Sequence, residues 1–112
     1  MIELARATAV CGVADIPLEG GVAALVDGVA VAVFRTHNGS VHAIGNVDPF
    51  SGASVLSRGI VGTRGEAPVV SSPMYKQAFD LRTGSCLDDA SVSVPSYDVW
   101  VVDGVVLVGG VR

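Results

Sequence analysis

Short apolar runs, most of them closed by Gly, Asp or Asn, follow one another along most of the chain. The longest of them, Val29 to Phe34, has only six residues. Val dominates these runs, and Val fits a pleated strand better than a helix because its branched side chain is stiff. No longer window keeps a helical period, and the best candidate is a single turn around Ala53 to Ser57. The pattern therefore predicts an all-β chain.

Three Asp-Gly or Asn-Gly pairs predict tight hairpin turns. Such pairs tolerate the positive φ angles that a two-residue hairpin turn demands. The pairs are Asp27-Gly28, Asn38-Gly39 and Asp103-Gly104. The strands expected around them are Val22–Val26, Val29–Thr36, Val41–Gly45, Asp98–Val102 and Val105–Gly109.

Two shorter runs between these hairpins, Pro68–Ser71 and Gln77–Asp80, predict further strands. The stretch from Leu81 to Gly84 predicts another turn, in which Gly84 is free to take a left-handed conformation. Many short strands with frequent Gly turns are typical of a β-sandwich or a small barrel. At 112 residues, we expect a single domain, residues 1–112, that is long enough to bury a core.

Charge and composition exclude several classes of partner. The net charge is −4, and the seven basic residues are spread singly, whereas nucleic-acid binding needs a clustered basic face. A membrane span needs about 20 apolar residues, far more than the longest run offers. The segment Met1 to Gly12 carries Glu3 and Arg6 and no long apolar stretch, so we expect no signal peptide and a cytoplasmic protein.

The two cysteines, Cys11 and Cys86, are far apart in the sequence and form no Cys-x-x-Cys motif. In a reducing compartment, two free thiols are favoured over a disulfide.

Two segments stand out from this generic pattern: AIGNVDPFSGASVLSRG, which begins at Ala43, and VVSSPMYKQAFDLRTG, which ends at Gly84. Together they resemble the two-loop core of Rieske domains. In that family a Cys-Pro-His loop and a Cys-Pro-x-His loop hold a [2Fe–2S] cluster, with two cysteines on one iron and two histidines on the other. The resemblance implies a Rieske-like antiparallel β-sandwich of short strands.

All four ligand positions implied by this resemblance are replaced. The cysteine positions fall at Asp48 and Ser72, and the histidine positions fall at Phe50 and Tyr75. Phe50 has no donor atom, and a serine hydroxyl is a poor substitute for a soft thiolate. We therefore expect no cofactor, metal or catalytic residue in this chain.

A Rieske-like domain with these replacements is similar to the small subunits of cytoplasmic NAD(P)H-dependent nitrite reductases. The matching stretches are Asn46 to Phe50, Ser54 to Gly59 and Ser72 to Phe79. The resemblance implies a non-catalytic subunit of an oxidoreductase that reduces nitrite to ammonium. Its partner would be a large subunit carrying siroheme, a [4Fe–4S] cluster, FAD and the NAD(P)H site. The alternative is a free-standing β-sandwich interaction module unrelated to nitrite.

Two replaced positions permit more than one role. Asp48 is better explained as a carboxylate that organises the loops than as a metal ligand, since no second acid, His or Cys lies near it in the sequence. Backbone N–H groups of the loops and the hydroxyls of Ser72 or Tyr75 could bond to it. Phe50 could fill the volume that a cluster would occupy, or it could be exposed and contact a partner. The sequence leaves these two open.

In Rieske-type domains the two loops lie together at one end of the sandwich, where the partner binds. We therefore expect a partner-binding surface made of Pro49, Phe50, Pro73, Met74, Tyr75 and Lys76. The competing view is that these side chains fold inward. The stretch between Phe50 and Ser72 is longer than the usual gap between the two Rieske loops, and the excess falls in Ile60–Pro68. We expect an added loop or hairpin there that is more mobile than its neighbours.

Overall fold

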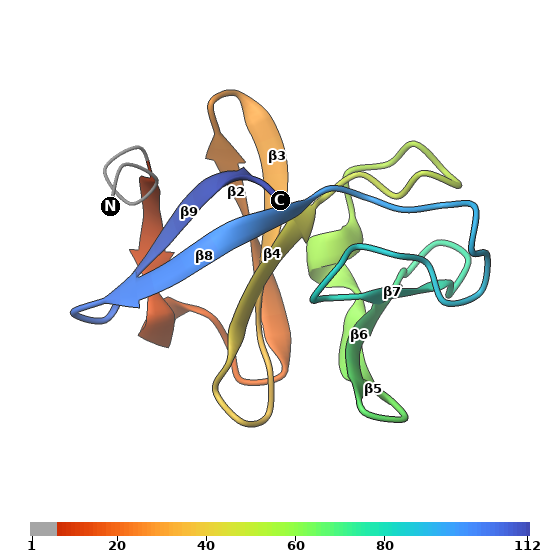
Figure 1. Cartoon of the computed structure of the whole chain (residues 1–112), viewed down its shortest axis with the longest axis horizontal. Helices are drawn as coiled ribbons and strands as arrows, with labels where there is room; N and C mark the ends of the chain where they lie inside the picture. Colours follow the sequence, from red (N-terminus) through yellow and green to blue (C-terminus); the bar gives the residue numbers. More distant parts are fainter. Residues whose placement is uncertain (1–6) are drawn as a thin grey trace.

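The computed structural model describes residues 7–112, and Glu3 and Arg6 lie outside this range. Nearly all regular structure is β, in two antiparallel sheets (Figure 1), so the all-β prediction is confirmed. The only helices among residues 7–112 are two three-residue 3-10 helices, η1 (Val13–Asp15) and η2 (Leu56–Arg58). No helix in this part of the chain is long and apolar enough to span a bilayer.

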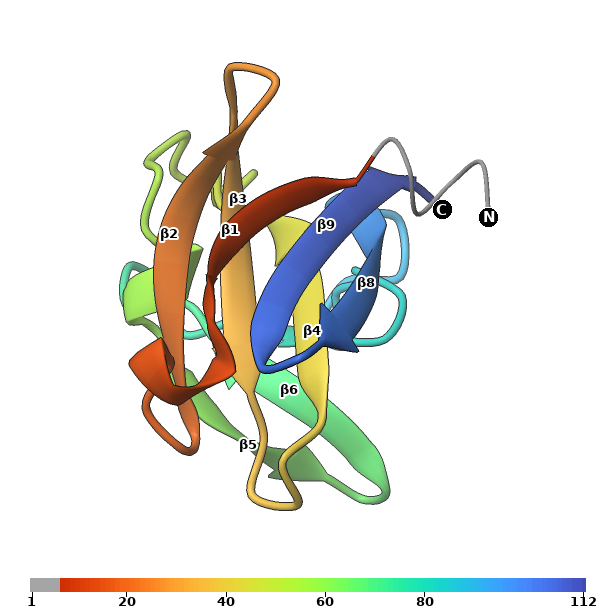
Figure 2. The ribbon, with the colours of Figure 1, turned by 90° about the vertical axis from the view of Figure 1, so that its left-hand side faces the viewer.

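The larger sheet has six strands in the order β1-β9-β8-β4-β3-β2. It curls on itself, so that β1 crosses between β9 and β2 in the side view of Figure 2. The strands span Thr8–Gly12 (β1), Gly20–Val26 (β2), Val29–Arg35 (β3), Val41–Gly45 (β4), Ser96–Val102 (β8) and Val105–Val111 (β9).

The smaller sheet has the order β5-β6-β7 and packs beside the larger one. Its strands are Ile60–Arg64 (β5), Ala67–Ser71 (β6) and Ala78–Asp80 (β7). The added segment therefore forms a hairpin rather than an open loop, because β5 pairs with β6 from Ile60↔Ser71 to Arg64↔Ala67. Gly65 lies at the turn with a φ of 62°.

Strand β3 explains why the longest apolar run is continuous. All four side chains from Val31 to Phe34 are fully buried, and alternate residues face opposite sides of a strand. Val31 and Val33 pack inside the curled sheet with Ile16 and Val108, whereas Phe34 packs toward the small sheet. A strand covered on both faces does not alternate between apolar and polar residues.

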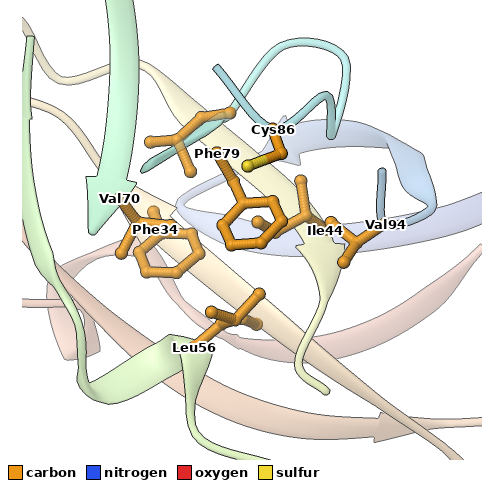
Figure 3. Close-up of a cluster of buried hydrophobic side chains, with 9 residues drawn as sticks. Phe34, Ile44, Leu56, Val70, Phe79, Cys86 and Val94 are labelled. Carbon is orange, nitrogen blue, oxygen red and sulfur yellow. The ribbon is translucent and has the colours of Figure 1, made fainter. Parts of the chain in front are cut away.

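The second core joins the two sheets. Figure 3 shows its side chains converging from the large sheet, from η2, from the small sheet and from the chain that follows it. Its labelled members are Phe34, Ile44, Leu56, Val70, Phe79, Cys86 and Val94. This core fixes η2 and the small sheet against the large sheet, and so fixes the ends of the loops that they bound.

Two of the three predicted hairpin turns are confirmed. Asp27 and Gly28 have φ of 51° and 79°, and Asp103 and Gly104 have φ of 50° and 77°. The prediction of a two-residue turn at Asn38-Gly39 is wrong, because five residues separate β3 from β4. The Asn38 Oδ1 atom accepts bonds from the Thr36 hydroxyl (2.6 Å) and the Ser40 N–H (3.0 Å), which stabilise a wider loop.

The turn from Leu81 to Gly84 is confirmed, with Gly84 at a φ of 82°. The turn expected around Ala53 to Ser57 is displaced by a few residues to η2. Strand β1 and helix η1 were not predicted. Cys11 and Cys86 are free cysteines, placed in separate cores.

Candidate functional site

Two loops occupy one end of the molecule, away from the β8–β9 turn (Figure 1). The first loop, residues 46–55, connects β4 to η2, and the second loop, residues 72–77, connects β6 to β7. Both follow buried strand ends, so their starting points are fixed by the cores described above. They contain every residue that the sequence singled out as a replaced ligand or partner contact.

Asn46 organises the first loop. Its side chain is 3% exposed, donates to the Ser54 hydroxyl (2.8 Å) and accepts from the Ser57 N–H (2.7 Å). Its carbonyl accepts the N–H groups of Val55 and Leu56. One buried side chain therefore connects the start of the loop, its return and η2. The sequence contained this Asn in a matching motif, but nothing local to it indicated its role.

Asp48 joins the first loop to the second. It is fully buried, its Oδ1 atom accepts the Phe50 N–H (2.8 Å), and its Oδ2 atom accepts the Ser72 hydroxyl (2.5 Å). The Ser72 Oγ atom accepts the Met74 N–H in turn (3.2 Å). The result is a chain of three hydrogen bonds from the Phe50 N–H to the Met74 N–H, in which the side chains of Asp48 and Ser72 join the two loops.

This relay connects the two positions that the resemblance assigns to cysteines on one iron. In place of two thiolates and a metal, the chain has a carboxylate and a hydroxyl in direct contact. The expectation that Asp48 organises the loops agrees with these bonds.

Phe50 and Tyr75, the positions that the resemblance assigns to histidines, lie differently. Phe50 is half-buried and packs against the core between the sheets, with its ring centroid 6.3 Å from that of Phe79. Tyr75 is 61% exposed. Of the two roles left open for Phe50, these contacts favour packing against the core over exposure to a partner.

The second loop presents an exposed tip. Pro73, Met74, Tyr75 and Lys76 are all exposed between buried Ser72 and buried Ala78. The tip is closed at its base by bonds from the Ser72 N–H to the Gln77 carbonyl (2.9 Å) and from the Lys76 N–H to the Ser72 carbonyl (3.0 Å). Lys76 has a φ of 66°, in the left-handed region that non-Gly residues rarely adopt.

Asp88 supports the far side of the second loop. Its carboxylate accepts the Ala78 N–H (2.8 Å) at the start of β7 and pairs with Arg64 (2.8 Å) at the end of β5. The pKa of Asp88 lies below its usual range, mainly because of the hydrogen bond from the Ala78 N–H and also because of the bond from Arg64. Nothing in the sequence analysis indicated that Asp88 connects β7 to the β5–β6 hairpin.

The residues at these loops do not fit an iron–sulfur cluster. A [2Fe–2S] group of the Rieske type needs thiolates and imidazoles, and the four positions offer a carboxylate, two hydroxyls and a phenyl ring. The side chains of Asp48 and Ser72, at the two positions that correspond to cysteines, are also hydrogen-bonded directly to each other. His37 and His42 lie on the β3–β4 hairpin, and Cys86 lies in the core. Burial, followed by the nearby charge of Arg112, lowers the pKa of His42.

The side chains of residues 7–112 include no group of three or more His, Cys, Asp or Glu placed to hold a metal ion. What the two loops offer is a fixed, mostly exposed surface built on a buried hydrogen-bonded base. Such a surface suits recognition of another protein.

Comparisons with known proteins agree on one family. The family model of the Rieske-like [2Fe-2S] domain matches residues 7–109. The nitrite reductase (NADH) small subunit of Salmonella typhimurium is 46% identical over 102 residues, which cover 90% of this chain and 94% of that protein. A crystal structure of a Mycobacterium tuberculosis protein, assigned as an NADH-dependent nitrite reductase small subunit, superposes with a TM-score of 0.90 at 53% identity. That match covers 95% of this chain and 96% of the other.

A third relative is built differently. The nitrite reductase [NAD(P)H] large subunit of Klebsiella oxytoca matches this chain at 40% identity over 101 residues. The match covers 90% of this chain but only 10% of that protein. A domain similar to this one is thus a small part of a much longer chain.

Proposed function

The chain belongs to the Rieske-like [2Fe-2S] domain family and to the nitrite reductase small subunits within it, and from this we propose that it is the non-catalytic small subunit of an NAD(P)H-dependent nitrite reductase. The enzyme is an oxidoreductase that reduces nitrite to ammonium. The role of this chain is to bind and support the large subunit. The relatives favour this function over a free-standing module unrelated to nitrite.

The Klebsiella oxytoca relative carries the argument for the partner. That protein is itself a large subunit and contains a stretch similar to nearly the whole of this chain. A domain that is covalently part of a large subunit in one protein and a small subunit in another is expected to contact the large subunit in both. Fusion holds the domain at high effective concentration next to its binding surface.

We assign the chemistry to that partner. The large subunit would carry siroheme, a [4Fe–4S] cluster, FAD and the NAD(P)H site. In this chain the loops that resemble a cluster site are joined by the Asp48–Ser72 hydrogen bond instead. Electron transfer and nitrite reduction would therefore take place on the partner, in the cytoplasm.

The second loop is the part of this chain that we place at the interface. Pro73, Met74, Tyr75 and Lys76 are exposed and held on a bonded base, which keeps the entropy lost on binding small. From the first loop, the exposed Pro49 and the solvent-accessible part of the half-buried Phe50 would add to the interface.

Co-purification tests the proposal. The tagged chain, expressed in a host that also produces the large subunit, should retain a long chain with flavin and siroheme absorption. The chain purified alone should show no [2Fe–2S] absorption. Recovery of the tagged chain without that partner, under conditions in which both are folded, would contradict the proposal.

A further inference from the structure

A groove of about 500 Å³ lies beside the second loop. One wall comes from the end of η2 and the start of β5, with Arg58 and Ile60, and the other comes from Ser72, Pro73 and Lys76. Its lining is mostly apolar. The sequence did not predict it, because its walls come from separate segments that meet only through the pairing of β5 with β6.

Large apolar side chains around this groove are exposed to solvent. Ile60, which lines it, is 78% exposed, and Tyr75 and Met74 in the adjoining loop are 61% and 47% exposed. Exposed apolar side chains in a groove and in the loop that borders it are typical of a protein interface.

The charge of the groove is opposite to that of the whole chain. The net charge is −4, yet the charged residues that line the groove are Arg58 and Lys76, without a carboxylate. Neither is in an ion pair with another of residues 7–112. Two cations that line a mostly apolar groove favour a partner segment that carries acidic residues.

Contacts hold the second-loop wall of the groove and the Gly59 backbone in place. Ser72 is held by Asp48, and Lys76 is kept in a left-handed conformation that persists only where the surroundings impose it. Gly59 packs so closely on β6 that an added Cβ would collide with the Ser71 carbonyl oxygen. A groove whose second-loop wall is already held in place loses less entropy on binding.

We propose that this groove receives a segment of the nitrite reductase large subunit, in which an apolar side chain that packs on Ile60 is flanked by Asp or Glu facing Arg58 and Lys76. The inference rests on the function proposed above. Within the interface proposed above, it places the centre at the side of the second loop that faces β5. The first loop, where Phe50 packs against the core, lies at the margin of that interface.

The proposed apolar contact with Ile60 is tested by Ile60→Ser, with Leu25→Ser as its control. Leu25 is 71% exposed on the edge strand β2 and Ile60 is 78% exposed on the edge strand β5, so the two changes remove similar solvent-exposed side chains. The affinity of each variant for the purified large subunit is measured by titration. We expect Ile60→Ser to raise the Kd at least ~10-fold and Leu25→Ser to leave it unchanged.

The acidic side chains proposed for the partner segment are tested by Arg58→Glu and Lys76→Glu, each compared with Arg112→Glu. All three change the net charge equally, but Arg112 is an exposed residue that does not line the groove. The groove variants should bind at least ~10-fold more weakly, and added salt should weaken wild-type binding.

The outcomes separate the inference from its premise. If the wild-type chain binds the large subunit and the groove variants bind equally well, the groove is not the interface, although the proposed function stands. If Ile60→Ser weakens binding and both charge reversals do not, the acidic character of the segment is wrong. If the wild-type chain does not bind the large subunit at all, the proposed function fails and the inference fails with it.

Discussion

Asp48 is a carboxylate with no solvent exposure, and each of its oxygens accepts one hydrogen bond. A charged group in such a place is tolerated only while its partners remain. The same residue explains how loops without a cluster keep a fixed shape. Bonds from the Phe50 N–H and the Ser72 hydroxyl replace metal–ligand bonds as the connection within and between the loops.

Removal of this connection should destabilise the fold. We expect Ser72→Ala to lower the free energy of unfolding by about 2–4 kcal/mol, because it deprives a buried carboxylate of a partner. Asp48→Ala/Ser72→Ala should cost less than the sum of the single changes, and the coupling should exceed ~1 kcal/mol. Urea unfolding of the four proteins measures this cycle. Additive effects would show that the two side chains do not depend on each other.

Tyr75 differs from Asp48, since its side chain is 61% exposed. Tyr75→Ala should therefore leave the melting temperature nearly unchanged while it weakens binding of the large subunit by at least ~1 kcal/mol. The measurements are thermal unfolding of the chain alone and titration with the partner. A lowered melting temperature with unchanged affinity would instead mean that the tip of the second loop is structural.

Asp80, at the end of β7, shows how a short strand is terminated. Its carboxylate accepts the Arg82 N–H (2.8 Å) and pairs with the Arg82 guanidinium (2.9 Å), while its carbonyl accepts the Gly84 N–H (2.7 Å). Gly84 cannot be replaced easily, because a Cβ there would collide with the Val94 carbonyl oxygen. The turn therefore requires both residues.

The interaction of Asp80 with Arg82 in this turn should make the stability of the fold depend on pH in the acid range. The Arg82 side chain, by its hydrogen bonds, holds the pKa of Asp80 below its usual range. Because the folded pKa is lower than the unfolded value of about 3.9, the stabilisation is present above that pH and is lost as pH falls through the folded pKa. Asp80→Asn should cost about 1 kcal/mol at neutral pH.

The check is the free energy of unfolding of both proteins from neutral pH to about pH 3. The difference between them should shrink as the pH falls. A constant difference would mean that the charge of Asp80 contributes nothing.

The hairpin of β5 and β6 forms the outer part of the small sheet. Ile60, Thr63 and Arg64 on β5 are exposed, and β5 is the edge of its sheet. We expect amide hydrogens of residues 60–68 in the isolated chain to exchange faster than those of β3 and β4, because few apolar contacts hold them. Protection throughout the hairpin equal to that of β3 would contradict this.

Elements determined by local chemistry could be predicted from the sequence, and those determined by distant contacts could not. Asp27-Gly28 and Asp103-Gly104 form tight turns because their own backbone preferences suffice. Strand β1 exists through its pairing with β9 at the other end of the chain. Likewise Asp48 was predictable as a structural carboxylate, whereas the placement of Phe50 depends on Phe79 in the second sheet.

At the scale of the whole molecule, two closed cores support one end that carries both loops and the groove. Each core consists of apolar side chains packed on one another, and a chain of this length can bury enough of them to hold its sheets together. In our proposal, this end is the surface that binds the large subunit. This arrangement accounts for a Rieske-like domain whose loops persist without cluster ligands.

The measurement that tests this account most directly is nitrite consumption, driven by NADH, by the purified large subunit with and without this chain. The chain is first shown to be free of iron–sulfur absorption. The account predicts that the rate rises with added chain and saturates once the large subunit is fully bound, although the chain brings no cofactor. A rate that is the same at every concentration of the chain, or a rise that requires iron bound to it, would contradict the account.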